Sequence, residues 1–123
     1  THEEMKLMIK GKGGMYAFTG VNDAYKVEMA AMDGDKKSLA VLEAMAYQTA
    51  KYIGAASTVL KGDVDAILIT GGMANGKWFA NLIIERVYKI GPVYIYPGED
   101  EMRALAENGE MILTGEVEAK EYK

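Results

Sequence analysis

The sequence predicts an α/β domain, because two short apolar segments typical of strands flank a segment with helical periodicity. Residues 64–69 are almost continuously apolar, which is typical of a strand in a parallel sheet that is covered on both faces. Residues 77–90 carry apolar side chains at helical spacing, and residues 93–96 form the second apolar segment. A strand, a helix and a strand in this order predict a right-handed parallel βαβ unit.

The first half of the chain predicts helices. A long helix is expected over residues 35–60, closed by Gly62, because one apolar stripe repeats at alternating steps of three and four. The stripe consists of Leu39, Leu42, Ala46, Thr49, Ile53, Ala56 and Leu60. Shorter helices are expected over residues 2–10 and over residues 23–32, the second with Asn22 or Asp23 as its N-cap. Residues 15–18 are expected to form a short strand or an extended loop.

The last part of the chain predicts one more helix. Pro97-Gly98 precedes it, and its first turn carries Glu99, Asp100 and Glu101. We expect Asn108-Gly109 to interrupt or end this helix, and the tail, 116–123, to be a frayed helix. Two strands are too few for a stable sheet, so either residues 15–19 contribute more strand than they show, or the missing strands come from a second copy or a longer parent protein.

Composition excludes several classes of function. We expect one domain over residues 1–123, with a net charge of −4 and only Arg86 and Arg103 as arginines, which argues against nucleic-acid and anionic-membrane partners. The absence of cysteine excludes thiol chemistry and disulfides. His2 is the only histidine and lies beside a terminus, which argues against a Ser–His–Asp triad or a histidine-based metal site within a single copy of the chain. Apolar runs are short of a membrane span, and we expect a cytoplasmic protein.

The most informative motif is the glycine turn after the first predicted strand. Residues 71–77 have the spacing of a phosphate-binding P-loop, but Trp78 stands where that motif needs a hydroxyl for Mg²⁺. A dinucleotide fingerprint is absent after both strands. The remaining interpretations are a tight turn that uses glycine for its backbone freedom, or a turn whose backbone approaches a nucleotide.

Several segments together resemble a known family. They are Thr70-Gly71-Gly72-Met73-Ala74, the run GPVYIYPGEDEM over residues 91–102, Glu43–Gln48, and Gly11–Gly14. These segments closely resemble the C-terminal part of butyrate kinases, and the resemblance covers essentially the whole chain.

The resemblance implies a fold and an activity. Butyrate kinases, like acetate kinase, transfer a phosphoryl group between ATP and a short-chain carboxylate, giving ADP and an acyl phosphate, with Mg²⁺. The implied fold is a pair of ribonuclease-H-like domains with the nucleotide in the cleft between them. This chain would be the C-terminal part of the second domain, without the phosphate loops or the first domain. We therefore expect it to bind nucleotide but to be inactive alone, and we assign no catalytic residue within it.

The resemblance also implies site residues. Gly71 and Gly72 would contact adenosine, followed on the same turn by Met73, Ala74 and Asn75, with Asn75 placed to bond the ribose or base.

Three further residues complete the implied site. Asp23 matches an acidic position near the nucleotide, although an N-cap role explains it equally well. Tyr25 stands where these kinases commonly have arginine, so a charged contact would be missing. Glu101 is the nearest counterpart of a carboxylate close to the catalytic metal.

A second functional class remains open at this stage. The chain can instead be a non-catalytic adenine-nucleotide-binding or self-associating module derived from that domain. Exposed sheet edges favour pairing between copies, and we expect a homo-oligomer in either case.

Overall fold

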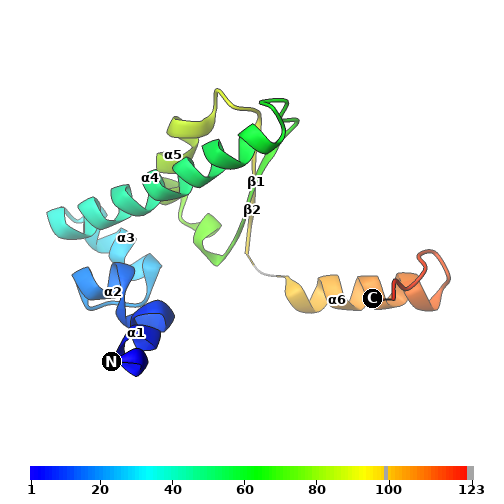
Figure 1. Cartoon of the computed structure of the whole chain (residues 1–123), viewed down its shortest axis with the longest axis horizontal. Helices are drawn as coiled ribbons and strands as arrows, with labels where there is room; N and C mark the ends of the chain where they lie inside the picture. Colours follow the sequence, from blue (N-terminus) through cyan, green and yellow to red (C-terminus); the bar gives the residue numbers. More distant parts are fainter. Residues whose placement is uncertain (99, 122–123) are drawn as a thin grey trace.

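The computed structural model describes residues 1–98 and 100–121, with only the backbone of Glu101 (Figure 1). The first half is helical: α1 (His2–Leu7), a wider helical turn η1 (Met8–Lys12), α2 (Gly14–Thr19), α3 (Ala24–Met32) and α4 (Lys36–Val59). The second half contains β1 (Ile67–Gly71), the 3₁₀ turn η2 (Gly72–Asn75), α5 (Lys77–Val87), β2 (Val93–Pro97) and α6 (Glu101–Leu113). The α/β class is therefore confirmed.

The predicted βαβ unit is present. Strands β1 and β2 are parallel, with Ile67 opposite Val93 and Thr70 opposite Tyr96, and α5 connects them. The first strand lies later in the chain than residues 64–69, and it continues through Thr70 into Gly71. The first glycine of the turn, Gly71, is therefore the last residue of the strand, and Gly72 begins η2.

The core lies where α4 crosses α3 and α5. The fully buried side chains of Val27, Leu42 and Val87 meet there, one from each helix. The predicted stripe on α4 is right at Leu42 and Ala46. It is wrong towards the end of the helix, where Thr49, Ala56 and Leu60 are exposed and Ala50 is buried instead.

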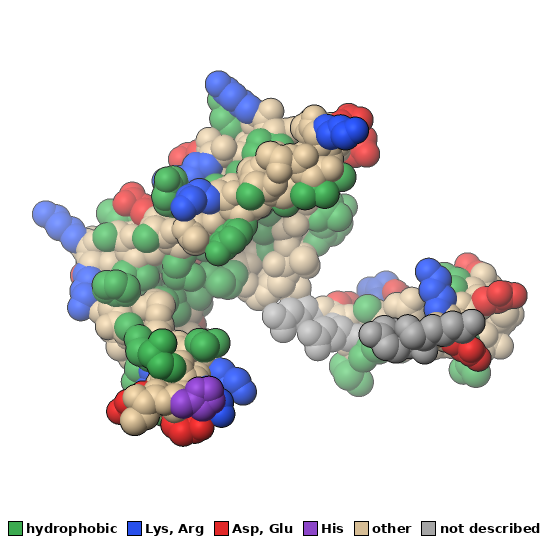
Figure 2. All heavy atoms as spheres, viewed as in Figure 1, with side chains coloured by type: hydrophobic (Ala, Val, Ile, Leu, Met, Phe, Trp, Pro, Cys, Tyr) green, Lys and Arg blue, Asp and Glu red, His purple; other side chains and the backbone are tan. Residues whose placement is uncertain are grey.

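Only one face of the sheet is covered. Ile67, Ile69 and Val93 pack on the core, whereas Leu68, Tyr94 and Tyr96 are exposed. The prediction of a strand covered on both faces is therefore wrong for the described residues, because no described element lies over the second face. Apolar side chains are visible on the surface in several places, including the N-terminal helices (Figure 2).

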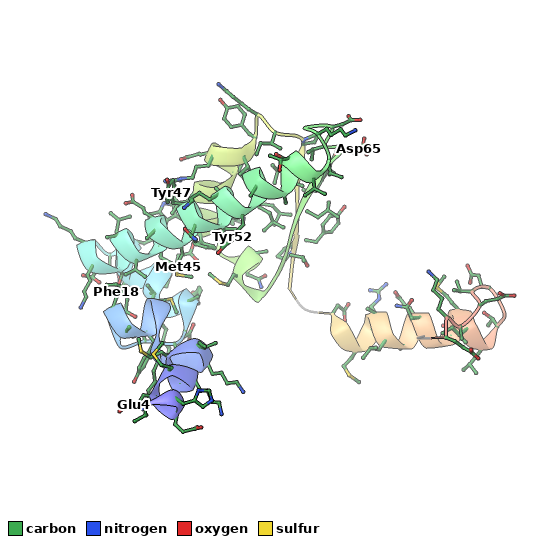
Figure 3. The ribbon with its side chains drawn as sticks, in the orientation of Figure 1. Glu4, Phe18, Met45, Tyr47, Tyr52 and Asp65 are labelled. Carbon is green, nitrogen blue, oxygen red and sulfur yellow. The ribbon has the colours of Figure 1, made fainter. Side chains whose placement is uncertain are left out.

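Residues 15–18 form a helix, which corrects the prediction of a strand or extended loop. They lie within α2, where the hydroxyl of Thr19 donates to the carbonyl of Met15 at 2.8 Å. Phe18 and Met45 lie between α2 and α4, where both line an apolar cavity (Figure 3). Packing against α4 therefore decides the conformation of this segment.

The last helix also differs from the prediction. α6 runs through Asn108-Gly109 without a break and ends at Leu113, with Thr114 as its C-cap and Gly115 following at φ 76°. The side-chain amide of Asn108 donates to the carbonyl of Ala104 at 2.8 Å, so it joins the helix instead of competing with it. The described part of the tail, residues 116–121, contains no helix, contrary to expectation.

Candidate functional site

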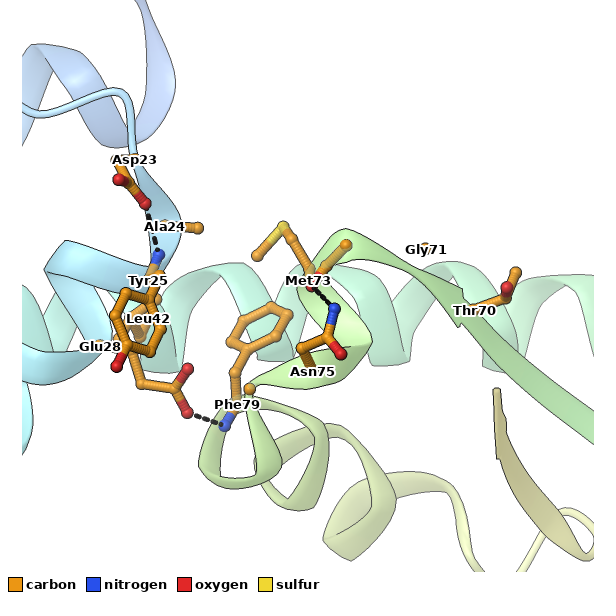
Figure 4. Close-up of a pocket in the computed structure, with 12 residues that line it drawn as sticks. Asp23, Ala24, Tyr25, Glu28, Leu42, Thr70, Gly71, Met73, Asn75 and Phe79 are labelled. Carbon is orange, nitrogen blue, oxygen red and sulfur yellow. Dashed lines mark hydrogen bonds between the residues drawn. The ribbon is translucent and has the colours of Figure 1, made fainter. Parts of the chain in front are cut away.

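A cavity of about 690 Å³ opens beside the glycine turn, between the beginnings of α3 and α5 (Figure 4). Its described lining comprises Asp23, Ala24, Tyr25, Glu28, Leu42, Thr70, Gly71, Gly72, Met73, Asn75, Gly76 and Phe79. This volume is within the range of sites for small molecules. Segments far apart in the sequence therefore meet around one hollow of suitable size.

Gly71 gives the turn its shape. Its φ is 90°, a backbone conformation that residues with a side chain rarely adopt. A Cβ built on Gly71 meets nothing within 4 Å, so the backbone conformation and not crowding requires glycine. The carbonyl of Gly71 accepts from the N–H of Gly98 at 3.2 Å, which ties the ends of the two strands together. A stretch of backbone without a side chain thus faces the cavity.

The side-chain amide of Asn75 closes the rest of the turn. The side-chain N–H of Asn75 donates to the carbonyl of Gly72 at 3.0 Å, and both residues line the cavity. Met73 lines it as well, whereas Ala74 is buried and is not among the lining residues. Of the five residues expected on this turn, four therefore face the cavity, and Ala74 packs behind them.

The beginning of α3 forms the opposite wall. Asp23 is the N-cap of this helix, and its Oδ1 accepts from the N–H groups of Tyr25 and Lys26 at 3.0 and 3.4 Å. Tyr25 lines the cavity with its side chain mostly exposed. The structure therefore brings Asp23 and Tyr25 to the glycine turn, although they lie almost fifty positions earlier in the chain.

Glu28 is a lining residue that sequence reasoning missed. It is 7% exposed, and its Oε1 accepts from the N–H groups of Trp78 and Phe79, each at 3.1 Å. These N–H groups belong to the first turn of α5, and no carbonyl of α5 itself can accept their hydrogen bonds. The sequence contained a hint of this role, because Glu28 is a charged residue between Val27 and Ala31 on the apolar side of its helix. A buried carboxylate must find donors.

The cavity is acidic. Among its described lining residues the charged side chains are Asp23 and Glu28, and none is lysine or arginine. Two carboxylates without a lining cation disfavour phosphate. The arrangement suits the uncharged part of a ligand.

The geometry argues against a P-loop. A P-loop holds phosphate with free N–H groups at the start of its helix. Here the N–H groups of Trp78 and Phe79 donate to Glu28 instead, and residues 72–75 are wound into η2. Lys77 is outside the lining of this cavity.

A metal site is not assembled in the part of the chain described here. Glu101 is the first residue of α6, but its side chain lies outside the described residues, as does Glu99. Within the described ranges, no three histidine, cysteine, aspartate or glutamate side chains gather closely enough to hold an ion. The residues present therefore do not by themselves fit Mg²⁺. No helix among the described residues is long and apolar enough to cross a membrane.

Fold and cavity together define an α/β protein with a candidate small-molecule site at the end of a parallel strand. The model of the acetokinase family matches residues 1–118, and the chain belongs to that family.

Relatives of the chain carry a consistent name. Butyrate kinase 2 and butyrate kinase 1 of Clostridium acetobutylicum are 48% and 50% identical to the chain over all 123 residues. Probable butyrate kinase 2 of Caldanaerobacter subterraneus subsp. tengcongensis is 48% identical over 122 residues. These matches cover 99–100% of the chain but only 34–35% of each relative, so the chain spans about a third of their length.

Proposed function

We propose that this chain is the nucleoside-binding part of a butyrate-kinase-like enzyme, which transfers a phosphoryl group between ATP and a short-chain carboxylate. The observation that carries the proposal is the cavity, because six of the seven residues that the resemblance implies for nucleotide binding line it. The relatives named butyrate kinase support the reaction and, through it, ATP or ADP as the ligand.

The cavity offers a different surface to each part of adenosine. Met73 provides exposed apolar surface for the base, with the buried Leu42 and Phe79 behind it, and Tyr25 can stack on the base. Asn75 spends one N–H on Gly72, which leaves its Oδ1 to accept a hydrogen bond from the base or ribose. The exposed backbone of Gly71 and Gly72 lets the nucleoside approach closely, as no side chain intervenes.

The same cavity explains why the chain alone is expected to be inactive. Phosphoryl transfer needs cations and a metal around the transferred group, and the described lining supplies neither. We propose that the phosphate loops, most Mg²⁺ ligands and the carboxylate pocket belong to the remainder of a longer enzyme. In that enzyme this chain forms the C-terminal part of the second ribonuclease-H-like domain, and we expect the enzyme to be cytoplasmic.

The test is a chimera. The first two-thirds of butyrate kinase 2 from Clostridium acetobutylicum, joined to this chain, should form butyryl phosphate from butyrate and ATP, and the chain alone should not. Gly71→Ala in the chimera should raise the KM for ATP. Gly34→Ala is the matched control: its φ is 98°, a Cβ there also meets nothing within 4 Å, and it lies outside the cavity. A folded chimera without activity, or equal effects of the two substitutions on KM, would count against the proposal.

The alternative is a non-catalytic module that associates with itself, as a homo-oligomer. The uncovered sheet face with Leu68, Tyr94 and Tyr96 favours some covering polypeptide. Sedimentation of the chain with and without Tyr94→Lys tests self-association through this face. A stable dimer that the substitution dissociates, together with a folded but inactive chimera, would support the module. A monomer in both cases would contradict it.

A further inference from the structure

The carboxylate of Glu28 occupies a place where an anion would otherwise be attracted. The N-terminus of a helix carries free N–H groups and a partial positive charge, which together favour phosphate. At the start of α5, Oε1 of Glu28 takes the N–H groups of both Trp78 and Phe79. The negative charge that this helix end favours is thus supplied from within the protein.

The position of Glu28 is fixed on several sides. Its helix neighbours Val27 and Ala31 are buried in the core. A Cβ added to Gly76 would overlap the carboxylate, with the Cδ of Glu28 only 3.0 Å away. No lysine or arginine within the described part of the chain forms an ion pair with it. Among the described residues, two backbone N–H groups and no ion pair stabilise its charge, which faces the cavity that it lines.

We propose that Glu28 determines specificity, because its charge excludes phosphate from the amino end of α5 and orients a bound nucleotide with its uncharged end in this cavity. The orientation of the nucleotide rests on the proposed function, whereas the exclusion of phosphate does not. Asp23, the other carboxylate of the lining, adds to the same field from the beginning of α3.

Glu28→Gln is the informative substitution. Glutamine removes the charge and keeps an oxygen that can accept from Trp78 and Phe79, so the contact survives. This neutral oxygen is a weaker acceptor than a carboxylate, and phosphate can displace it from the two N–H groups. The matched control is Asp35→Asn, which makes the same change in charge at a helix end. Asp35 caps α4 by accepting from the N–H groups of Lys37 and Ser38, and it does not line the cavity.

The experiment follows backbone amide shifts by NMR during titration with inorganic phosphate and, separately, with adenosine. Phosphate should leave Trp78 and Phe79 unshifted in the unsubstituted chain and in Asp35→Asn. In Glu28→Gln, phosphate should shift both amides. Its affinity should be at least about tenfold higher than for the unsubstituted chain or Asp35→Asn. Adenosine should shift Gly71–Asn75 and Tyr25 in all three proteins.

The outcomes separate the two ideas. Saturable phosphate shifts at Trp78 and Phe79 in the unsubstituted chain would overturn the role of Glu28, and this result needs no variant to fold. Equal phosphate affinity in Glu28→Gln and Asp35→Asn would overturn it as well. If phosphate behaves as expected but adenosine shifts none of the cavity amides, the charge effect stands and the proposed nucleoside site falls.

Discussion

Glu28 and Gly76 fit together so closely that the carboxylate of the first lies where the second would carry a Cβ. Gly76 has ordinary backbone angles, φ −73° and ψ 91°, so its own conformation does not require glycine. Glycine is required at this position because the carboxylate of Glu28 occupies the space that a Cβ would need. The pair therefore joins α3 to the beginning of α5 across one wall of the cavity.

Gly76→Ala should destabilise the protein by about 1–3 kcal/mol, because the added methyl must displace a buried, hydrogen-bonded carboxylate. Gly54→Ala is the control, since Gly54 lies inside α4 and a Cβ there meets nothing within 4 Å. That substitution should stabilise by about 0.5–1 kcal/mol through its helix propensity. Urea unfolding measures both values. Equal effects of the two substitutions would show that the contact with Glu28 has no energetic weight.

Glu28→Ala should cost about 2 kcal/mol or more in the free energy of unfolding, because the N–H groups of Trp78 and Phe79 lose their acceptor. Glu28→Gln should recover more than half of that loss, since its amide oxygen can accept the same bonds. The loss is measured by urea unfolding of the three proteins. Loss of the same size in both variants would mean that charge, and not hydrogen bonding, holds α5.

The cap of α4 gives a dependence on pH. The hydroxyl of Ser38, followed by its backbone N–H, lowers the pKa of Asp35 below the ordinary 3.8. A carboxylate whose pKa is lower in the folded state adds stability above its unfolded pKa, and this stability is lost as pH falls through the folded pKa. The stability gap between the unsubstituted chain and Asp35→Asn should thus be constant above about pH 5 and shrink below pH 4.

Ser38→Ala checks the cause of this shift. Without the hydroxyl, the pKa of Asp35 should move back up towards its ordinary value, which a carbon NMR titration of the carboxyl group reads directly. An unchanged pKa would assign the shift to another source.

Much of the fold was predictable from the sequence because local rules agreed with tertiary packing. Spacing and turn residues predicted the long helix before Gly62, the parallel βαβ unit and an N-cap at Asn22 or Asp23, of which the structure has Asp23. Residues 15–18 were predicted wrongly because packing against α4 overrides a weak local pattern. The prediction of a break at Asn108-Gly109 was wrong because the Asn108 side chain donates a hydrogen bond to the carbonyl of Ala104 in its own helix.

The candidate site also contains residues that could be predicted and residues that could not. The glycine turn was visible in the sequence, since a strand and a helix flank it. That Asp23 and Tyr25 line the same cavity came from the resemblance to butyrate kinases, because no local pattern links α3 to β1. Glu28 was missed because its hydrogen bonds to Trp78 and Phe79 exist only after α3 and α5 pack together.

The most direct measurement is titration of the chain with adenosine, with ATP, and with ATP plus Mg²⁺, followed by backbone amide NMR. A nucleoside site predicts that all three shift the same amides, those of Gly71–Asn75 and Tyr25, with affinities that barely depend on Mg²⁺. Shifts confined to other residues, or no shifts in a folded chain, would contradict the assignment of this cavity to the nucleoside.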